Sequence, residues 1–212
     1  EKYFDLGDYS MKISTKHSRA QLWYNRGLRW CFGFNHEEAV RCFENALKFD
    51  SRCPMIYWGI GYASGSNYNN PTNLDSKAAY EASHKALQLS TERKITNIEQ
   101  QIIKGLVPRY KWPHRDPNED HQGWSNEMDQ LRKTYVKSMS KAFENHPDNT
   151  DVAYLYIEAL MCQNAWKLWE TDESTGNKIR PETFLAKELL EKHLKIQPKH
   201  PGLGHLYIHM ME

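Results

Sequence analysis

The strongest constraint on the fold is a pair of helix-like patterns separated by a glycine turn. Within residues 18–33, large and small side chains recur three and four positions apart, and the same spacing returns within residues 37–49. Residues at this spacing share one face of an α-helix. The two sets are Trp23, Gly27 and Trp30, then Ala39, Phe43 and Ala46. With Gly33 between them, they predict two antiparallel helices whose small residues let the backbones approach.

Asn35 is predicted to cap the second of these helices. Glu38 stands three residues later, and this spacing predicts a capping box. His36 follows the cap, where free backbone N–H groups attract an anion or a carboxylate. A turn role is the commoner use of such residues. We nevertheless take His36 as a candidate catalytic residue and Asn35 as a candidate ligand-binding residue.

The hairpin pattern begins again 34 residues later. Tyr57 stands 34 residues after Trp23, and Gly61 stands 34 residues after Gly27. The second helix of this unit is displaced by a polar insertion at residues 65–73, and its small and medium positions are Ala79, Ser83 and Ala86. Asn67 and Asn69 in the insertion are candidate ligand-binding residues, although asparagines in loops more often make turns.

The rest of the chain also favours helices. Pro108 predicts a helix end, and the polar stretch 109–122 predicts an exposed loop. Further helices are predicted over residues 74–89, 91–107, 124–145, 150–163 and 182–196, and from about residue 202. Residues 165–180 have no regular pattern, and no segment has the alternation of a strand. The sequence therefore predicts an all-α fold.

Composition narrows the class of partner. Lys and Arg together number 28 and Asp and Glu number 27, so the net charge near zero does not favour nucleic acid or an anionic membrane. The longest apolar runs are too short to span a bilayer. Four cysteines without a CxxC pair fit buried thiols in a reducing compartment, and we expect a cytoplasmic protein.

The end of the chain carries the sharpest cluster of candidate ligands. His205 and His209 are four residues apart, and Glu212 follows three residues later on the same stripe. Two imidazoles at this spacing suit zinc, and two imidazoles with a carboxylate also suit copper, iron or manganese. The competing interpretation is that both histidines are packed and hydrogen-bonded. Trp166 is a candidate ligand-binding residue, because an indole ring can stack on a ligand, although packing is its commoner use.

The hairpin spacings resemble those of tetratricopeptide repeats. The segments FNHEEA at 34–39 and HPGLGHLYIH at 200–209 resemble more closely a group of bacterial and fungal tetratricopeptide proteins. The resemblance implies one domain over residues 1–212, built as a right-handed solenoid of antiparallel helix pairs. It also implies a shared pocket lined by histidines, and further helices after residue 212. A helical edge left uncovered there predicts a homo-oligomer.

Two functions remain open from the sequence. The first is a binding protein whose concave face holds a protein, a peptide or a small molecule. Arg26, Arg29 and Arg41 do not form the regular basic ladder expected of a domain that binds peptide carboxylates. The second is a metal-dependent enzyme acting on a small molecule, with His205, His209 and Glu212 as metal ligands.

Overall fold

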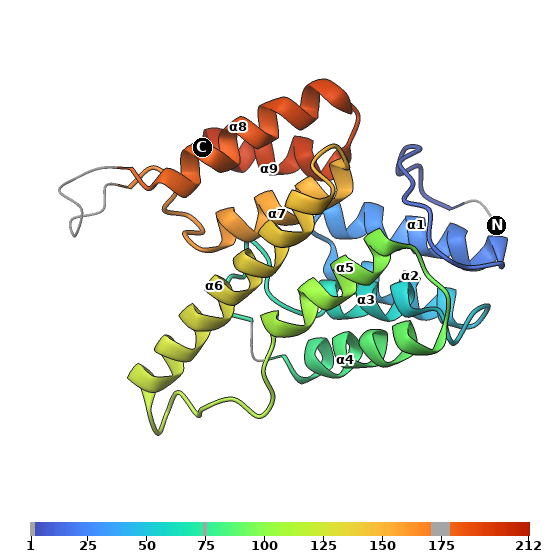
Figure 1. The fold of residues 1–212 in the computed structure, drawn as a ribbon, viewed down its shortest axis with the longest axis horizontal. Coiled ribbons are helices and arrows are strands. Elements are labelled where there is room, and N and C mark those ends of the chain that lie inside the picture. Colours follow the sequence, from blue (N-terminus) through green and yellow to red (C-terminus); the bar gives the residue numbers. More distant parts are fainter. Residues whose placement is uncertain (1–2, 74–75, 171–178) are drawn as a thin grey trace.

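The computed structural model describes residues 3–73, 76–170 and 179–212, and within these ranges it is all-helical, as predicted. Each helix contacts the next one along the chain, and Figure 1 shows the long α6 (His121–Asn145) crossing the molecule diagonally. The elements are α1 Ser18–Phe32, α2 His36–Leu47, α3 Pro54–Ala63, α4 Lys77–Glu92, α5 Asn97–Leu106, the 3₁₀ turn η1 Val107–Arg109, α6 His121–Asn145, α7 Thr150–Cys162, α8 Pro181–Ile196 and α9 Pro201–Met211. None of these helices is both long enough and apolar enough to cross a membrane.

The first hairpin packs through the small residues that the sequence singled out. Phe43 on α2 is fully buried, and its ring lies between Gly27 of α1 and Gly59 of α3. A Cβ atom at Gly27 would lie 2.5 Å from the Phe43 ring, and one at Gly59 would lie 2.7 Å from it. The two glycines therefore let three helices close around one aromatic ring.

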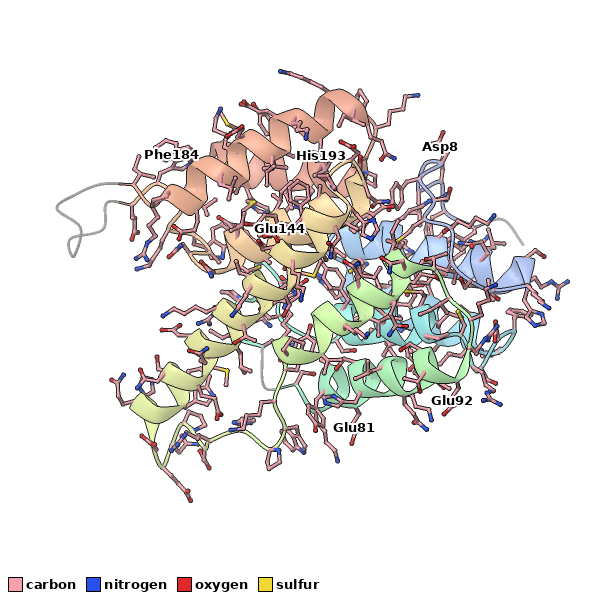
Figure 2. All side chains as sticks on the ribbon, in the orientation of Figure 1. Asp8, Glu81, Glu92, Glu144, Phe184 and His193 are labelled. Carbon is pink, nitrogen blue, oxygen red and sulfur yellow. The ribbon has the colours of Figure 1, made fainter. Side chains whose placement is uncertain are left out.

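The second hairpin keeps the same register. A Cβ atom at Gly61 of α3 would lie 3.1 Å from the backbone nitrogen of Ser83 in α4. Gly61 thus faces Ser83 as Gly27 faces Phe43, across an insertion that leaves the pairing unchanged. Figure 2 shows side chains filling the spaces between the helices.

The first and the last of the described helices contact each other. In an open solenoid each repeat contacts only its neighbours. Here α9 packs against α1 as well as against α7 and α8. This contact is not one that an open solenoid predicts, and it brings the histidines of α9 to the turn that follows α1.

Several predicted boundaries were wrong. The helix predicted over 91–107 begins at Asn97, because Thr96 is its N-cap and forms a capping box with Glu99. Residues 91–92 belong instead to α4, which begins after the cap Ser76. The helix predicted from residue 124 begins at His121, capped by Asp120.

Two local predictions were only partly right. Asn35 caps α2, accepting the N–H of Glu38 on its side chain at 3.2 Å. The second bond of a capping box would run from the Asn35 N–H to the Glu38 side chain. The Asn35 N–H donates instead to the carbonyl of Trp30 at 2.9 Å. The start of the predicted exposed loop is also different, since Arg109 is 1% exposed.

Candidate functional site

The site is built around Phe34, in the turn between α1 and α2. Its backbone has a φ of +60°, a left-handed conformation that costs a non-glycine residue about 1–2 kcal/mol. This conformation places the Phe34 ring among three imidazoles. Its centroid lies 4.1 Å from that of His205 and 5.6 Å from those of His36 and His209.

Each of the three histidines has one ring nitrogen fixed by an oxygen acceptor. The Nδ1–H of His205 donates to the Phe32 carbonyl at 2.8 Å, and that of His36 donates to the Phe34 carbonyl at 3.2 Å. The Nδ1–H of His209 donates to the Glu212 carboxylate at 2.9 Å. Because carbonyl and carboxylate oxygens only accept, the proton lies on Nδ1 in each ring and the neutral form keeps a lone pair on Nε2.

His209 occupies the centre of this arrangement. It is 9% exposed, and its ring contacts those of Phe34, His205, Tyr68 and Trp166. Its Nε2 atom is buried and has no hydrogen-bond partner within the described residues. A buried polar atom without a partner costs about 1–3 kcal/mol, so this lone pair is a natural contact point for a ligand donor.

Trp166 and Tyr68 form the other wall. Trp166 is 58% exposed and has a φ of +65°; within the described ranges, only Phe34 and Trp166 are non-glycine residues with positive φ. Its backbone N–H donates to the Tyr68 hydroxyl at 3.2 Å. Both strained residues therefore contact His209, and backbone strain of this kind clusters at functional sites.

Two cavities adjoin this group of rings. The first, here called the asparagine pocket, measures about 740 Å³ and is lined by Phe34, Asn35, His36, Glu37 and the insertion with Asn67, Asn69, Asn70 and Asn73. The second, here called the tryptophan pocket, measures about 530 Å³ and is lined by Tyr68, Lys167, Leu168, His209, Glu212 and the segment Trp166, Trp169 and Glu170. Phe34 lines the asparagine pocket, and its ring stacks on that of His209, which lines the tryptophan pocket together with Tyr68.

The candidate residues from the sequence thus lie close together, but the side-chain oxygens of two of the asparagines are engaged in a turn and a helix cap. The side-chain oxygen of Asn67 accepts the N–H groups of both Asn69 and Asn70 at 3.0 Å, which closes the insertion as a turn. The side-chain oxygen of Asn35 caps α2. Asn69 is exposed at the rim of the pocket. These residues shape the asparagine pocket more than they offer it free acceptors.

The predicted metal ligands share one stripe of α9, but their donor atoms are engaged separately. Glu212 holds the Nδ1 of His209, and His205 donates to Phe32. Across the described ranges, no group of three or more His, Cys, Asp or Glu side chains is placed to hold a metal ion. In this arrangement Glu212 orients His209, as a carboxylate does behind a metal-bound imidazole, and is not itself placed as a ligand.

Burial changes the acid–base properties of the surrounding groups. Desolvation lowers the pKa of His36 below its ordinary value, although the bond to the Phe34 carbonyl opposes the shift. Desolvation raises the pKa of Tyr68, against the N–H of Trp166 that favours the phenolate. His36 therefore stays neutral at pH 7 and can accept a hydrogen bond or a proton through Nε2.

Phe34 and Tyr68 are the site residues that sequence reasoning missed. Both stand inside motifs that the analysis singled out, next to Asn35 and Asn67. A large apolar residue directly before an N-cap is an ordinary helix signal, so the pattern alone assigns Phe34 to packing. Its left-handed backbone and its contact with α9 have no local sequence signal.

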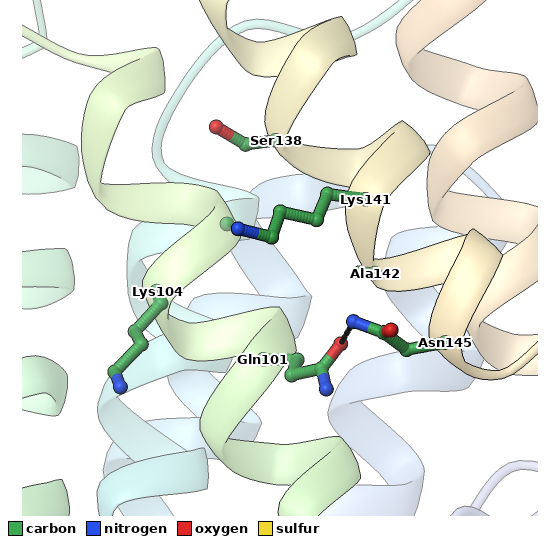
Figure 3. A pocket seen from close by; sticks show the side chains of 7 residues that line it. Gln101, Lys104, Ser138, Lys141, Ala142 and Asn145 are labelled. Carbon is green, nitrogen blue, oxygen red and sulfur yellow. Dashed lines mark hydrogen bonds between the residues drawn. The ribbon is translucent and has the colours of Figure 1, made fainter.

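Another cavity lies away from these rings, between α5 and α6. It measures about 350 Å³, and its lining includes Lys104 and Lys141. Figure 3 shows Asn145 donating to Gln101 across it, at 3.2 Å. Its buried polar atoms are paired, and it follows from the small side chains of Gly105 and Ala142 between two helices.

The geometry therefore points to one centre, at the junction of the α1–α2 turn, the insertion and α9. Its distinguishing group is the carboxylate-held imidazole of His209. No protein-family model matches the chain, and a search of curated proteins returns no match.

Proposed function

We propose that this chain is a helical-repeat binding protein of the tetratricopeptide type, whose histidine-lined site holds a small polar ligand. The observation that carries the proposal is the buried Nε2 of His209, which lacks a hydrogen-bond partner within the described residues although His209 lines the tryptophan pocket. Ligand pockets combine apolar and aromatic walls with a few fixed polar groups, and this site has that composition.

The repeat assignment rests on packing. The Gly27–Phe43 and Gly61–Ser83 contacts place two helix pairs in the same register, which is the relation expected of tetratricopeptide units. The ligand site rests on the departure from that pattern, where α9 meets α1. A small molecule is favoured over a peptide because the cavities are separate pockets and not one continuous groove.

The first test is ligand-observed NMR with a library of small polar molecules. We expect at least one compound to bind, and His209→Leu to weaken its binding about tenfold, because the ligand donor loses the imidazole acceptor. The matched control is His84→Leu, since the Nδ1 of His84 also bonds an oxygen acceptor and its ring contacts an aromatic ring, but on α4. Equal loss of binding in both variants, or no binding compound, would contradict the proposal.

A metal-dependent enzyme acting on a small molecule is the second candidate. One observation favours it, because a carboxylate that holds Nδ1 orients Nε2 as metal ligands are oriented. His209 and His205 would then be ligands, with Glu212 behind His209 and His36 as an acid–base group near the metal.

Elemental analysis of untagged protein separates the two candidates. Under the binding proposal we expect the ligand found by NMR to keep its affinity after dialysis against EDTA. Near-stoichiometric zinc, copper, iron or manganese, together with loss of ligand binding on chelation, would instead favour the enzyme. The variant pair His205→Ala and His209→Ala must then also lose the metal.

A further inference from the structure

The tryptophan pocket has an acidic charge balance. Its charged lining groups are Glu170, Glu212 and Lys167. Lys167 lies 3.6 Å from Glu170, and both side chains are mostly exposed, so these two charges offset each other. The Glu212 carboxylate is left with the His209 Nδ1–H as its partner. A carboxylate in this position attracts a cation and repels an anion.

The aromatic walls of the pocket favour the same kind of ligand. Tyr68, Trp166 and Trp169 line it, and the two indoles are 58% and 37% exposed. Cations of this chain lie over other rings, such as Arg109 over Tyr135 and Arg26 over Tyr3, but within the described residues none lies over these three. Organic cations bind preferentially over the face of an indole ring.

A third group in the lining of the pocket is a hydrogen-bond acceptor. The Nε2 of His209 carries a lone pair, and the Trp166 ring packs edge-on against the imidazole at 5.6 Å. Glu212 bonds the Nδ1 atom on the other side of the same ring, so a single donor atom cannot reach both Glu212 and Nε2.

We propose that the tryptophan pocket takes the protonated amine of an organic cation. The ammonium donates to Glu212, and its charge lies against the Trp166 ring. This inference rests on the proposed function, since it names the ligand class for the same site. A quaternary ammonium lacks the N–H donors, a neutral alcohol lacks the charge, and a carboxylate is repelled.

The test compares four probes with one aromatic body. We measure binding of 2-phenylethylammonium, its N,N,N-trimethyl derivative, 2-phenylethanol and 3-phenylpropionate to the whole chain by saturation-transfer NMR, with tryptophan fluorescence as the second readout. We expect the primary ammonium to bind about tenfold more tightly than the alcohol, about fivefold more tightly than the trimethyl derivative, and the carboxylate to bind most weakly.

Two variants place the binding in this pocket. Trp166→Leu is expected to weaken 2-phenylethylammonium at least fivefold, whereas Trp112→Leu, at another exposed tryptophan, is expected to leave it unchanged. Glu212→Gln is expected to weaken it up to about fivefold and to leave 2-phenylethanol unchanged, with Glu188→Gln on α8 as the control. Circular dichroism confirms that each variant is folded.

The outcomes separate this inference from the function on which it rests. Equal affinity for the alcohol and the ammonium, preference for the carboxylate, or binding that survives Trp166→Leu overturns the amine assignment. If the polar library nevertheless yields a ligand that depends on His209, the proposed function stands with another ligand class. If neither the probes nor the library bind, both are wrong.

Discussion

Replacing Glu158 by alanine is expected to lower the free energy of unfolding by about 3–5 kcal/mol, because it leaves a buried guanidinium without its counter-ion. Glu158 is 2% exposed and Arg109 is 1% exposed. The two Arg109 NH groups donate to both carboxylate oxygens, at 2.7 and 3.1 Å. The Cys162 thiol donates to the same carboxylate at 3.0 Å, and the Tyr135 ring lies 4.2 Å from the guanidinium.

Urea denaturation measures this effect. The matched control is Arg52→Ala, which removes an exposed bridge to Glu92 with the same 2.7 Å separation and is expected to cost less than about 1 kcal/mol. A double variant, Arg109→Met with Glu158→Leu, is expected to be more stable than Glu158→Ala, because it removes both buried charges together. If Glu158→Ala lowers the free energy of unfolding no more than Arg52→Ala does, the Arg109–Glu158 pair is hydrated and the claim that it is buried is wrong.

Adding one methyl group at Gly27 is expected to destabilise the fold by about 1–3 kcal/mol. The new Cβ would lie 2.5 Å from the Phe43 ring, which Gly59 confines on its other side. The matched control is Gly204→Ala on α9, where a Cβ meets nothing within 4 Å. There the same change is expected to stabilise the protein by about 0.5–1 kcal/mol, through helix propensity alone.

The sign of the Gly27 effect depends on the Phe43 ring. In a Phe43→Ala background the space is empty, so Gly27→Ala is expected to become neutral or stabilising by up to about 1 kcal/mol. Thermal or urea unfolding of the four proteins of this double-mutant cycle gives the coupling directly. A Gly27→Ala penalty that persists without the Phe43 ring would falsify the close-packing account.

Much of the helical framework was predictable from the sequence, because its signals are local. The spacing of Gly27 and Phe43 gave the first hairpin, and the Asn35 cap set its second helix. The boundary errors had local causes as well. The Thr96–Glu99 capping box is a local signal in the sequence, and it places the start of α5 at Asn97.

The candidate site was predictable only in part. The spacing of His209 and Glu212 on one helix stripe is a local property, and the structure joins them by a hydrogen bond. The contact between His205 and Phe32 joins residues 173 positions apart, and no periodic pattern encodes such a contact. Arg109 begins the polar stretch 109–122, which predicts an exposed loop, and only its partner Glu158, on another helix, makes its burial possible.

The contact between α9 and α1 has a consequence for folding and ligand binding. Because the site combines groups from the α1–α2 turn and from α9, it exists only when α9 is packed against α1. A ligand that binds there raises the free energy of global unfolding by mass action, not that of one repeat alone. The contact between α9 and α1 joins residues that are far apart in the sequence, so docking of α9 is expected to be a late step in folding. Undocking of α9 would dismantle the site, so a bound ligand is expected to slow amide hydrogen exchange in α9.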